Sequence, residues 1–212
     1  MVREHNSVLA ASEKRLLVNI ASRLPAWINS DHLTFTGAVA MLGIGVCYWV
    51  GGGALWMVIP LLALNWFGDS LDGTLARVRK QERPRYGYYV DHVLDAVGFA
   101  CLFGGLILGG HMSPVIGLGF LAAYFLVISE ISMATHARGK FKMAFMKVGP
   151  TELRIILAAG TIQLMRSDSL SIFGQQWLLF DVGGLVAAAG MLIAFATAAV
   201  RNGVALYNEE RL

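Results

Sequence analysis

Charged residues are scarce in this sequence. Asp, Glu, Lys and Arg make up 15% of its 212 residues, against about 25% in an ordinary soluble domain. Hydrophobic residues make up 56%, and the mean hydropathy is +0.60. A soluble helical protein could not use this much apolar sequence without exposing it to water. The composition therefore predicts an integral membrane protein.

Cysteine is scarce as well. Cys47 and Cys101 lie inside apolar stretches with no pairing pattern, so we expect small core residues and neither a disulfide nor a metal site. A cleavable signal peptide is not expected either, because charged residues interrupt the N-terminal region before any apolar core forms. These charged residues are Arg3, Glu4, Glu13, Lys14 and Arg15.

Six apolar segments follow one another along the chain, at residues 33–50, 54–76, 86–109, 114–137, 150–165 and 179–200. Each is near the length of about 20 residues that a helix needs to cross a bilayer, and the fifth is the shortest. Helices are expected because lipid offers no partners to unpaired backbone groups. The fold class predicted is an all-α integral membrane protein with six transmembrane helices.

Lysine and arginine are concentrated in every second connection between these segments, and therefore at one side of the membrane. The turns at 51–53 and around His111 have none, and the loop after the fifth segment has only Arg166. The basic positions are Arg3, Lys14, Arg15 and Arg23; Arg77, Arg79, Lys80, Arg83 and Arg85; Arg138, Lys140, Lys142 and Lys147; and Arg201 and Arg211. By the positive-inside rule, both termini and both basic loops are expected in the cytoplasm, at the plasma (inner) membrane.

The N-terminal region has a different pattern. Residues 8–28 repeat apolar residues at helical spacing with basic residues between them, which predicts an amphipathic helix on the cytoplasmic surface. A soluble stub or a tilted start to the first span are the alternatives. The predicted organisation is an N-terminal cytoplasmic segment at 1–32, a transmembrane catalytic domain at 33–205, and a cytoplasmic tail at 206–212.

Two pairs of aspartates interrupt the second and third apolar segments. Asp69 and Asp72 are three residues apart, and Asp91 and Asp95 are four apart, so each pair lies on one helix face. Because a short loop joins the two helices, the pairs should face one another at the cytoplasmic side. Four converging carboxylates would repel, and ionised groups in a membrane are costly unless paired or metal-bound.

Divalent metal is the predicted partner of these carboxylates. Hard oxygen ligands suit Mg²⁺, Mn²⁺ or Ca²⁺, and phosphate chemistry commonly uses two such ions. Ordinary ion pairs with the basic loop are the alternative. Gly73, Ala76 and Gly87 lie on or beside the carboxylate face, where small residues let helices or a ligand's phosphates approach the backbone.

The whole pattern reads Asp69-x-x-Asp72-Gly73-x-x-Ala76-Arg77, then nine residues, then Gly87-x-x-x-Asp91-x-x-x-Asp95. It resembles the signature of the CDP-alcohol phosphotransferase family. The upstream residues Asn29, Leu33, Thr34 and Gly37 also resemble that family's entry into its first span, although the proline usual before the asparagine is missing.

The resemblance implies an enzyme that takes a CDP-linked donor, releases CMP and binds two Mg²⁺ or Mn²⁺ ions. Asp69, Asp72 and Asp91 would hold one ion, and Asp69, Asp91 and Asp95 the other. Asp95 would also be the general base that deprotonates the acceptor hydroxyl. The CDP-donor site would include Thr34, Gly73, Ala76, Arg77 and Gly87. One of the two substrates would be a lipid, a homodimer is common in the family, and no nucleic-acid partner is expected.

Two substrate arrangements stay open. CDP-diacylglycerol could give its phosphatidyl group to a small polar alcohol, or CDP-choline or CDP-ethanolamine could give its head group to diacylglycerol. The dipeptide Asp91-His92 resembles the second class, whereas the small size of the chain slightly favours the first.

Glu130 and Arg154 fall within apolar segments and need partners. They could pair with each other, or Arg154 could line an acceptor pocket with Arg138.

A membrane cation transporter or channel is the alternative function. Transport sites usually lie near the membrane midplane, often beside broken helices. The four aspartates instead fall at one end of their helices, next to a basic loop, and this favours the enzyme.

Overall fold

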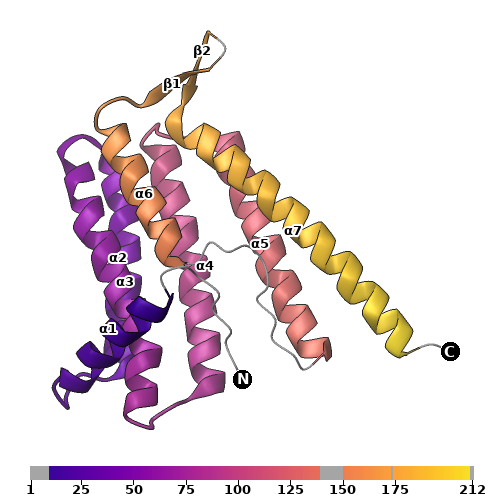
Figure 1. Cartoon of the computed structure of the whole chain (residues 1–212). Helices are drawn as coiled ribbons and strands as arrows, with labels where there is room; N and C mark the ends of the chain where they lie inside the picture. Colours follow the sequence, from indigo (N-terminus) through magenta and orange to yellow (C-terminus); the bar gives the residue numbers. More distant parts are fainter. Residues whose placement is uncertain (1–9, 139–149, 173, 211–212) are drawn as a thin grey trace.

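The computed structural model describes residues 10–138, 150–172 and 174–210, and helices make up most of that part of the chain (Figure 1). In chain order the elements are α1 (Ala10–Arg23), α2 (Ser30–Val50), the short 3₁₀ helix η1 (Gly52–Ala54), α3 (Leu55–Val78), α4 (Pro84–Leu108), α5 (Pro114–Arg138), α6 (Pro150–Leu164), β1 (Ser169–Ile172), β2 (Gln175–Leu178) and α7 (Leu179–Glu209). The prediction of an all-α membrane protein is confirmed.

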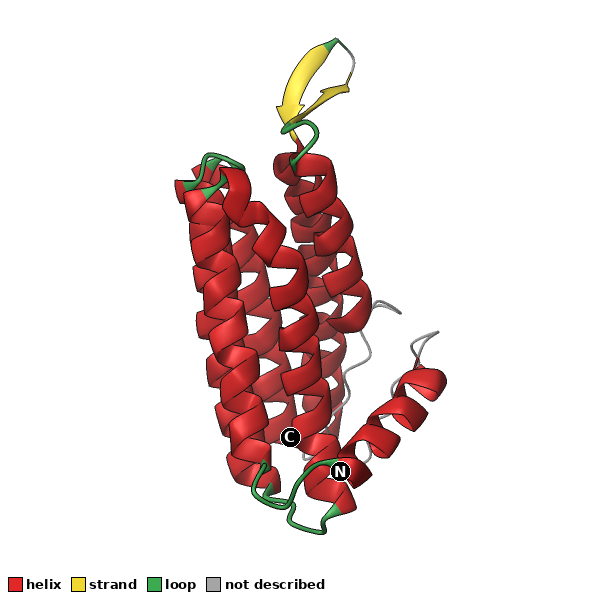
Figure 2. Ribbon diagram, turned by 90° about the vertical axis from the view of Figure 1, so that its left-hand side faces the viewer, coloured by secondary structure: helices red, strands yellow, loops and turns green. Residues whose placement is uncertain are grey.

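The long helices run side by side. Helices α2, α3 and α4 pack together, α6 lies against α3, and α5 pairs with α7. The β1–β2 hairpin stands at one end of the bundle, and α1, the α3–α4 loop and the last turn of α7 lie at the other (Figures 1 and 2). This arrangement puts the basic α3–α4 loop at the same end as α1.

Within the described residues, five helices are long and apolar enough to cross a membrane: α2, α3, α4, α5 and α7. Helix α6 occupies the fifth predicted segment but has 15 residues. At 1.5 Å per residue it is about 22 Å long, shorter than a hydrocarbon core of about 30 Å.

Glycines let α2 approach both of its neighbours. A Cβ at Gly68 of α3 would lie 2.5 Å from the carbonyl oxygen of Leu33, and a Cβ at Gly105 of α4 would overlap with the carbonyl oxygen of Gly45. Neither position can carry a side chain without separating the helices. Helix α2 therefore holds α3 and α4 close together, and these are the two helices that carry the aspartates.

Helix α1 forms within the segment predicted to be amphipathic. Its Leu17 and Ala21 are buried in a cluster with Leu33, Leu71 and Leu75. The Arg79 guanidinium, just after α3, donates hydrogen bonds to the carbonyls of Leu24 and Pro25 at 3.0 and 2.9 Å. The end of α1 and the end of α3 are thus fixed to one another through the chain that follows α1. A membrane-surface position for α1 stays a prediction.

The hairpin was not expected from the sequence. Strands β1 and β2 pair antiparallel, with Leu170 opposite Trp177, and Gly174 in the turn has a φ of +79°. The N–H of Leu179 donates to the carbonyl of Asp168 at 2.9 Å and closes the hairpin onto α7.

Both cysteines are free, as expected, but Cys101 is exposed on α4. The prediction that it is a core residue is therefore wrong.

Candidate functional site

Three of the four aspartates gather in one cluster. One carboxylate oxygen each from Asp69, Asp91 and Asp95 lies within 4.8 Å of the other two. Asp69 comes from α3, while Asp91 and Asp95 lie one turn apart on α4. Asp69 and Asp91 are half-buried and Asp95 is the most exposed of the three. Three carboxylates this close repel one another unless a cation lies among them.

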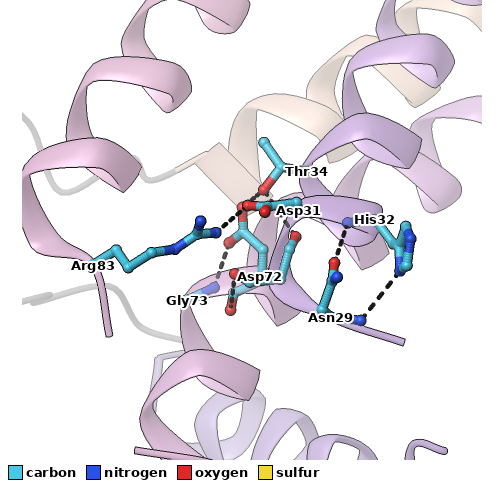
Figure 3. Close-up of polar contacts among 8 residues, drawn as sticks. Asn29, Asp31, His32, Thr34, Asp72, Gly73 and Arg83 are labelled. Carbon is cyan, nitrogen blue, oxygen red and sulfur yellow. Dashed lines mark hydrogen bonds and ion pairs between the residues drawn. The ribbon is translucent and has the colours of Figure 1, made fainter. Parts of the chain in front are cut away.

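Asp72 and the three clustered aspartates line one small cavity. Asp72 also accepts hydrogen bonds from residues close to it. The Thr34 hydroxyl lies 2.7 Å from one carboxylate oxygen, and the N–H of Gly73 donates to the other (Figure 3). The Ser30 hydroxyl also donates to the backbone carbonyl of Asp72 at 2.8 Å. The start of α2 is therefore attached to α3 at this aspartate. A carboxylate has about four acceptor positions, so these bonds leave Asp72 able to act as a ligand.

Thr34 is placed by the way α2 begins. The Asn29 side chain accepts a hydrogen bond from the N–H of His32 at 3.0 Å, and His32 Nδ1 accepts from the N–H of Asn29 at 3.3 Å. This reciprocal pair is a capping box in which His takes the usual place of Glu or Gln (Figure 3). It starts α2 one turn before Thr34, so that Thr34 faces Asp72.

Arg154 reaches the aspartates from α6. Its Nη2 lies 2.5 Å from a carboxylate oxygen of Asp69, and its Nε donates to Oδ1 of Asn65 at 2.7 Å. The Arg154 side chain is 15% exposed. Glu130, the other charged residue expected to need a partner, accepts a hydrogen bond from Asn202 of α7 at 2.6 Å. Arg154 and Glu130 thus bond to different residues.

The residues expected to bind the donor lie along α3 and at the start of α4. Arg77 folds back over α3, with Nη2 donating to the Thr74 hydroxyl at 3.0 Å, and a Cβ at Gly73 would lie 3.4 Å from its Nη1. Ala76 lines a second cavity of about 420 Å³. At Gly87 a Cβ would meet no described atom within 4 Å.

An ion pair borders this second cavity. Arg83, before α4, pairs with Asp31 of α2 (Figure 3), and its guanidinium lies 4.4 Å from the centre of the Tyr86 ring. Both Asp31 and Arg83 line the cavity.

Arg138 was expected near the acceptor. It is the last residue of α5, and its side chain lies outside the part of the structure that is described.

The three-carboxylate cluster suits a divalent metal ion. Carboxylate oxygens are hard ligands of the kind that Mg²⁺ and Mn²⁺ prefer, and the oxygens of Asp69, Asp91 and Asp95 are close enough to share one ion. Arg154 supplies one positive charge at Asp69.

Asn65 is a residue of this site that the sequence analysis missed. It lies in α3 four residues before Asp69 and contacts both Arg154 and Gly37. A signal was present, since an amide in an apolar segment on the helix face of Asp69 needs polar partners.

Parts of the chain are similar to known proteins. The chain is 35% identical over 86 residues to a phosphatidylinositol phosphate synthase of Cutibacterium acnes. This stretch covers 40% of each protein. It is 28% identical over 116 residues to a phosphatidylinositol phosphate synthase of Streptomyces avermitilis, which covers 53% of this chain and 46% of that one. The matched stretches thus span less than half the length of either relative.

The family model gives a longer match. The model for CDP-alcohol phosphatidyltransferase matches residues 27–200, a range that includes α2 to α6 and most of α7. It contains the complete aspartate pattern and both cavities. The chain therefore belongs to the CDP-alcohol phosphatidyltransferase family.

Proposed function

We propose that this protein transfers a phosphatidyl group from CDP-diacylglycerol to the hydroxyl of a phosphorylated polyol of the inositol phosphate type, with release of CMP. The observation that carries the proposal is the convergence of Asp69, Asp91 and Asp95 within 4.8 Å. Such a cluster suits a cation bound to phosphates better than a structural ion pair. Family membership supports the enzyme over a cation transporter.

Two observations support a phosphorylated polyol as the acceptor. Both relatives are named phosphatidylinositol phosphate synthase, and Arg154 brings a guanidinium to the edge of the aspartate cluster. Arginine is well suited to bind phosphate because its planar group offers several donors. The Asp91-His92 dipeptide had favoured choline or ethanolamine donors, and the names of the relatives outweigh it.

The reaction assigns a separate task to each group. The acceptor oxygen forms a bond to the phosphorus that carries the diacylglycerol, the bond from that phosphorus to the CMP oxygen breaks, and the hydroxyl proton passes to Asp95. Asp95 suits this role because it is the most exposed aspartate of the cluster. Two Mg²⁺ or Mn²⁺ ions, held by Asp69, Asp91 and Asp95 with Asp72 beside them, would stabilise the charge on the diphosphate and on the departing CMP.

The donor's nucleotide would bind at the cytoplasmic end of α3. Gly73, Arg77 and Gly87 would line the binding site of the nucleotide's phosphates, and Thr34 would lie close to that site. The cavity of about 420 Å³ beside Ala76 falls in the size range of small-molecule sites. The basic α3–α4 loop supports a cytoplasmic orientation of this end, at the plasma membrane.

A substrate panel tests the proposal. Purified protein is incubated with CDP-diacylglycerol, CDP-choline or CDP-ethanolamine, each combined with inositol phosphate, glycerol phosphate, serine or diacylglycerol, and both CMP and the lipid product are measured. We expect product from CDP-diacylglycerol with inositol phosphate. Product from CDP-choline and diacylglycerol alone would contradict the proposed substrates, and no CMP from any pair would contradict the enzyme.

A further inference from the structure

Asn65 is an almost fully buried amide, 9% exposed, in the middle of an apolar helix. Both ends of its side chain are engaged. Its Nδ2 donates to the carbonyl oxygen of Gly37 in α2 at 3.0 Å, and its Oδ1 accepts from Nε of Arg154 in α6 at 2.7 Å. One side chain of α3 therefore connects the helices on either side of it.

These two partners admit a single orientation of the amide. If the amide were turned over, its NH₂ would face the Nε–H donor of Arg154 and its oxygen would face the carbonyl of Gly37. Both contacts would then be repulsive. The close approach of α2 and α3 keeps that carbonyl in reach, since a Cβ at Gly37 would lie 3.5 Å from the backbone oxygen of Asn65.

The orientation of Asn65 determines that of Arg154. The guanidinium is planar and rigid, so fixing Nε on Asn65 and Nη2 on Asp69 also fixes the direction of Nη1. This third nitrogen is buried and has no hydrogen-bond partner among the described residues. A buried guanidinium N–H without a partner costs free energy, and an anionic oxygen of a ligand would remove that cost.

Without Asn65 a different pairing is favoured. Arginine and carboxylate groups commonly form two parallel hydrogen bonds, and Arg154 could then bind both oxygens of Asp69. That arrangement would occupy a second donor of Arg154 and change the direction of Nη1. The bond to Asn65 withdraws Nε from such a pairing.

We propose that Asn65 is a positioning residue for acceptor binding: it holds Arg154 so that one guanidinium N–H is directed to an anionic oxygen of the acceptor's phosphate. This role rests on the proposed function, in which the acceptor is phosphorylated. It predicts that Asn65 affects KM for the acceptor through Arg154, and not the chemistry of transfer.

The test replaces Asn65 by leucine, which has a similar volume and no hydrogen-bonding group. We expect KM for inositol phosphate to rise about 10-fold, the effect of losing one hydrogen bond to a charged group. KM for CDP-diacylglycerol and kcat should stay within about 2-fold. If Asn65→Leu is not monodisperse after purification, Asn65→Ser is measured instead, since its short hydroxyl cannot reach both partners.

Tyr48→Phe is the control for general packing of α6. The hydroxyls of Tyr48 in α2 and Thr161 in α6 lie 2.6 Å apart and are buried, and Thr161 follows Arg154 by about two turns of the same helix. This variant also removes a hydrogen bond that attaches α6, but far from the site. An equal rise in acceptor KM in Tyr48→Phe would show that loosened packing is responsible and would overturn the role of Asn65.

A double-mutant cycle completes the experiment. In an Arg154→Met background, Asn65→Leu should change acceptor KM by less than about 2-fold, because the residue through which it acts is gone. Full additivity of the two changes would overturn the proposal, as would an unchanged acceptor KM in Asn65→Leu alone. Wild-type protein that makes no lipid from CDP-diacylglycerol and inositol phosphate would contradict the proposed function, and the role of Asn65 with it.

Discussion

The guanidinium of Arg154 and the carboxylate of Asp69 lie 2.5 Å apart, although 85 residues separate them in the sequence. This pair attaches α6 to the aspartate-bearing face of α3. It also places one positive charge beside three clustered carboxylates. Helix α6, of which 15 residues are described, thereby becomes part of the site.

Arg154→Met should impair use of the acceptor more than use of the donor. We expect KM for inositol phosphate to rise by about 100-fold or more, because a buried charge-assisted phosphate contact is lost. Donor binding should change little. Arg166→Met is the matched control, since Arg166 is an exposed arginine just after α6 at the opposite end from the site. Similar kinetics for Arg154→Met and wild type would contradict the assigned contact.

Asp95→Asn and Asp69→Asn should fail in different ways. Asn keeps the shape of Asp95 but cannot accept the proton, so turnover should fall by about 10²–10⁴-fold with donor binding largely retained. Asp69→Asn should weaken metal and donor binding together, because Asp69 would contact both ions. Calorimetry of donor binding with and without Mg²⁺, together with product formation, separates the two effects. Identical binding defects in both variants would refute this division of roles.

Gly105→Ala should be far more harmful than Gly104→Ala, its neighbour on α4. A Cβ at Gly105 would overlap with the backbone oxygen of Gly45, whereas at Gly104 it would meet no described atom within 4 Å. Overpacking of this kind costs about 1–3 kcal/mol or more, so the thermal unfolding midpoint in detergent should fall for Gly105→Ala. The midpoint of Gly104→Ala should stay level or rise. Equal midpoints would show that α2 and α4 are not in such close contact.

The orientation in the membrane can be tested by cysteine labelling. Cys47 and Cys101 are first replaced by alanine, and single cysteines are introduced at Gly52 and at Lys80. A membrane-impermeant maleimide should label position 52 in intact cells and position 80 only after the membrane is opened. The reverse pattern would place the aspartates at the outer face and exclude the predicted topology.

Much of the site could be predicted from the sequence because its aspartates lie on two consecutive helices. Spacings of three and four residues place Asp69 and Asp72, and Asp91 and Asp95, on single faces, and the short α3–α4 loop brings those faces together. The meeting of Asp69, Asp91 and Asp95 follows from such local geometry. The apolar segments likewise indicated the helices, since their length reflects bilayer thickness.

Other features depend on packing between distant segments. Nothing in the spacing of residues revealed that Arg154 would lie beside Asp69, or that Glu130 would bond to Asn202, because both contacts depend on how α6 and α7 pack. The hairpin was missed because strands of four residues are too short to stand out beside long apolar segments. Asp72 was expected to hold one ion together with Asp69 and Asp91, and the sequence did not reveal its bond to Thr34, which depends on the capped start of α2.

The requirement for metal tests the central claim most directly, namely that the clustered aspartates of α3 and α4 catalyse transfer from a CDP-alcohol by holding divalent cations. The measurement is CMP release from CDP-diacylglycerol in the presence of inositol phosphate, before and after treatment with excess EDTA. We predict that release stops in EDTA and returns when Mg²⁺ or Mn²⁺ is added in excess of the chelator. Full turnover in EDTA by protein that elemental analysis finds free of metal would contradict the account.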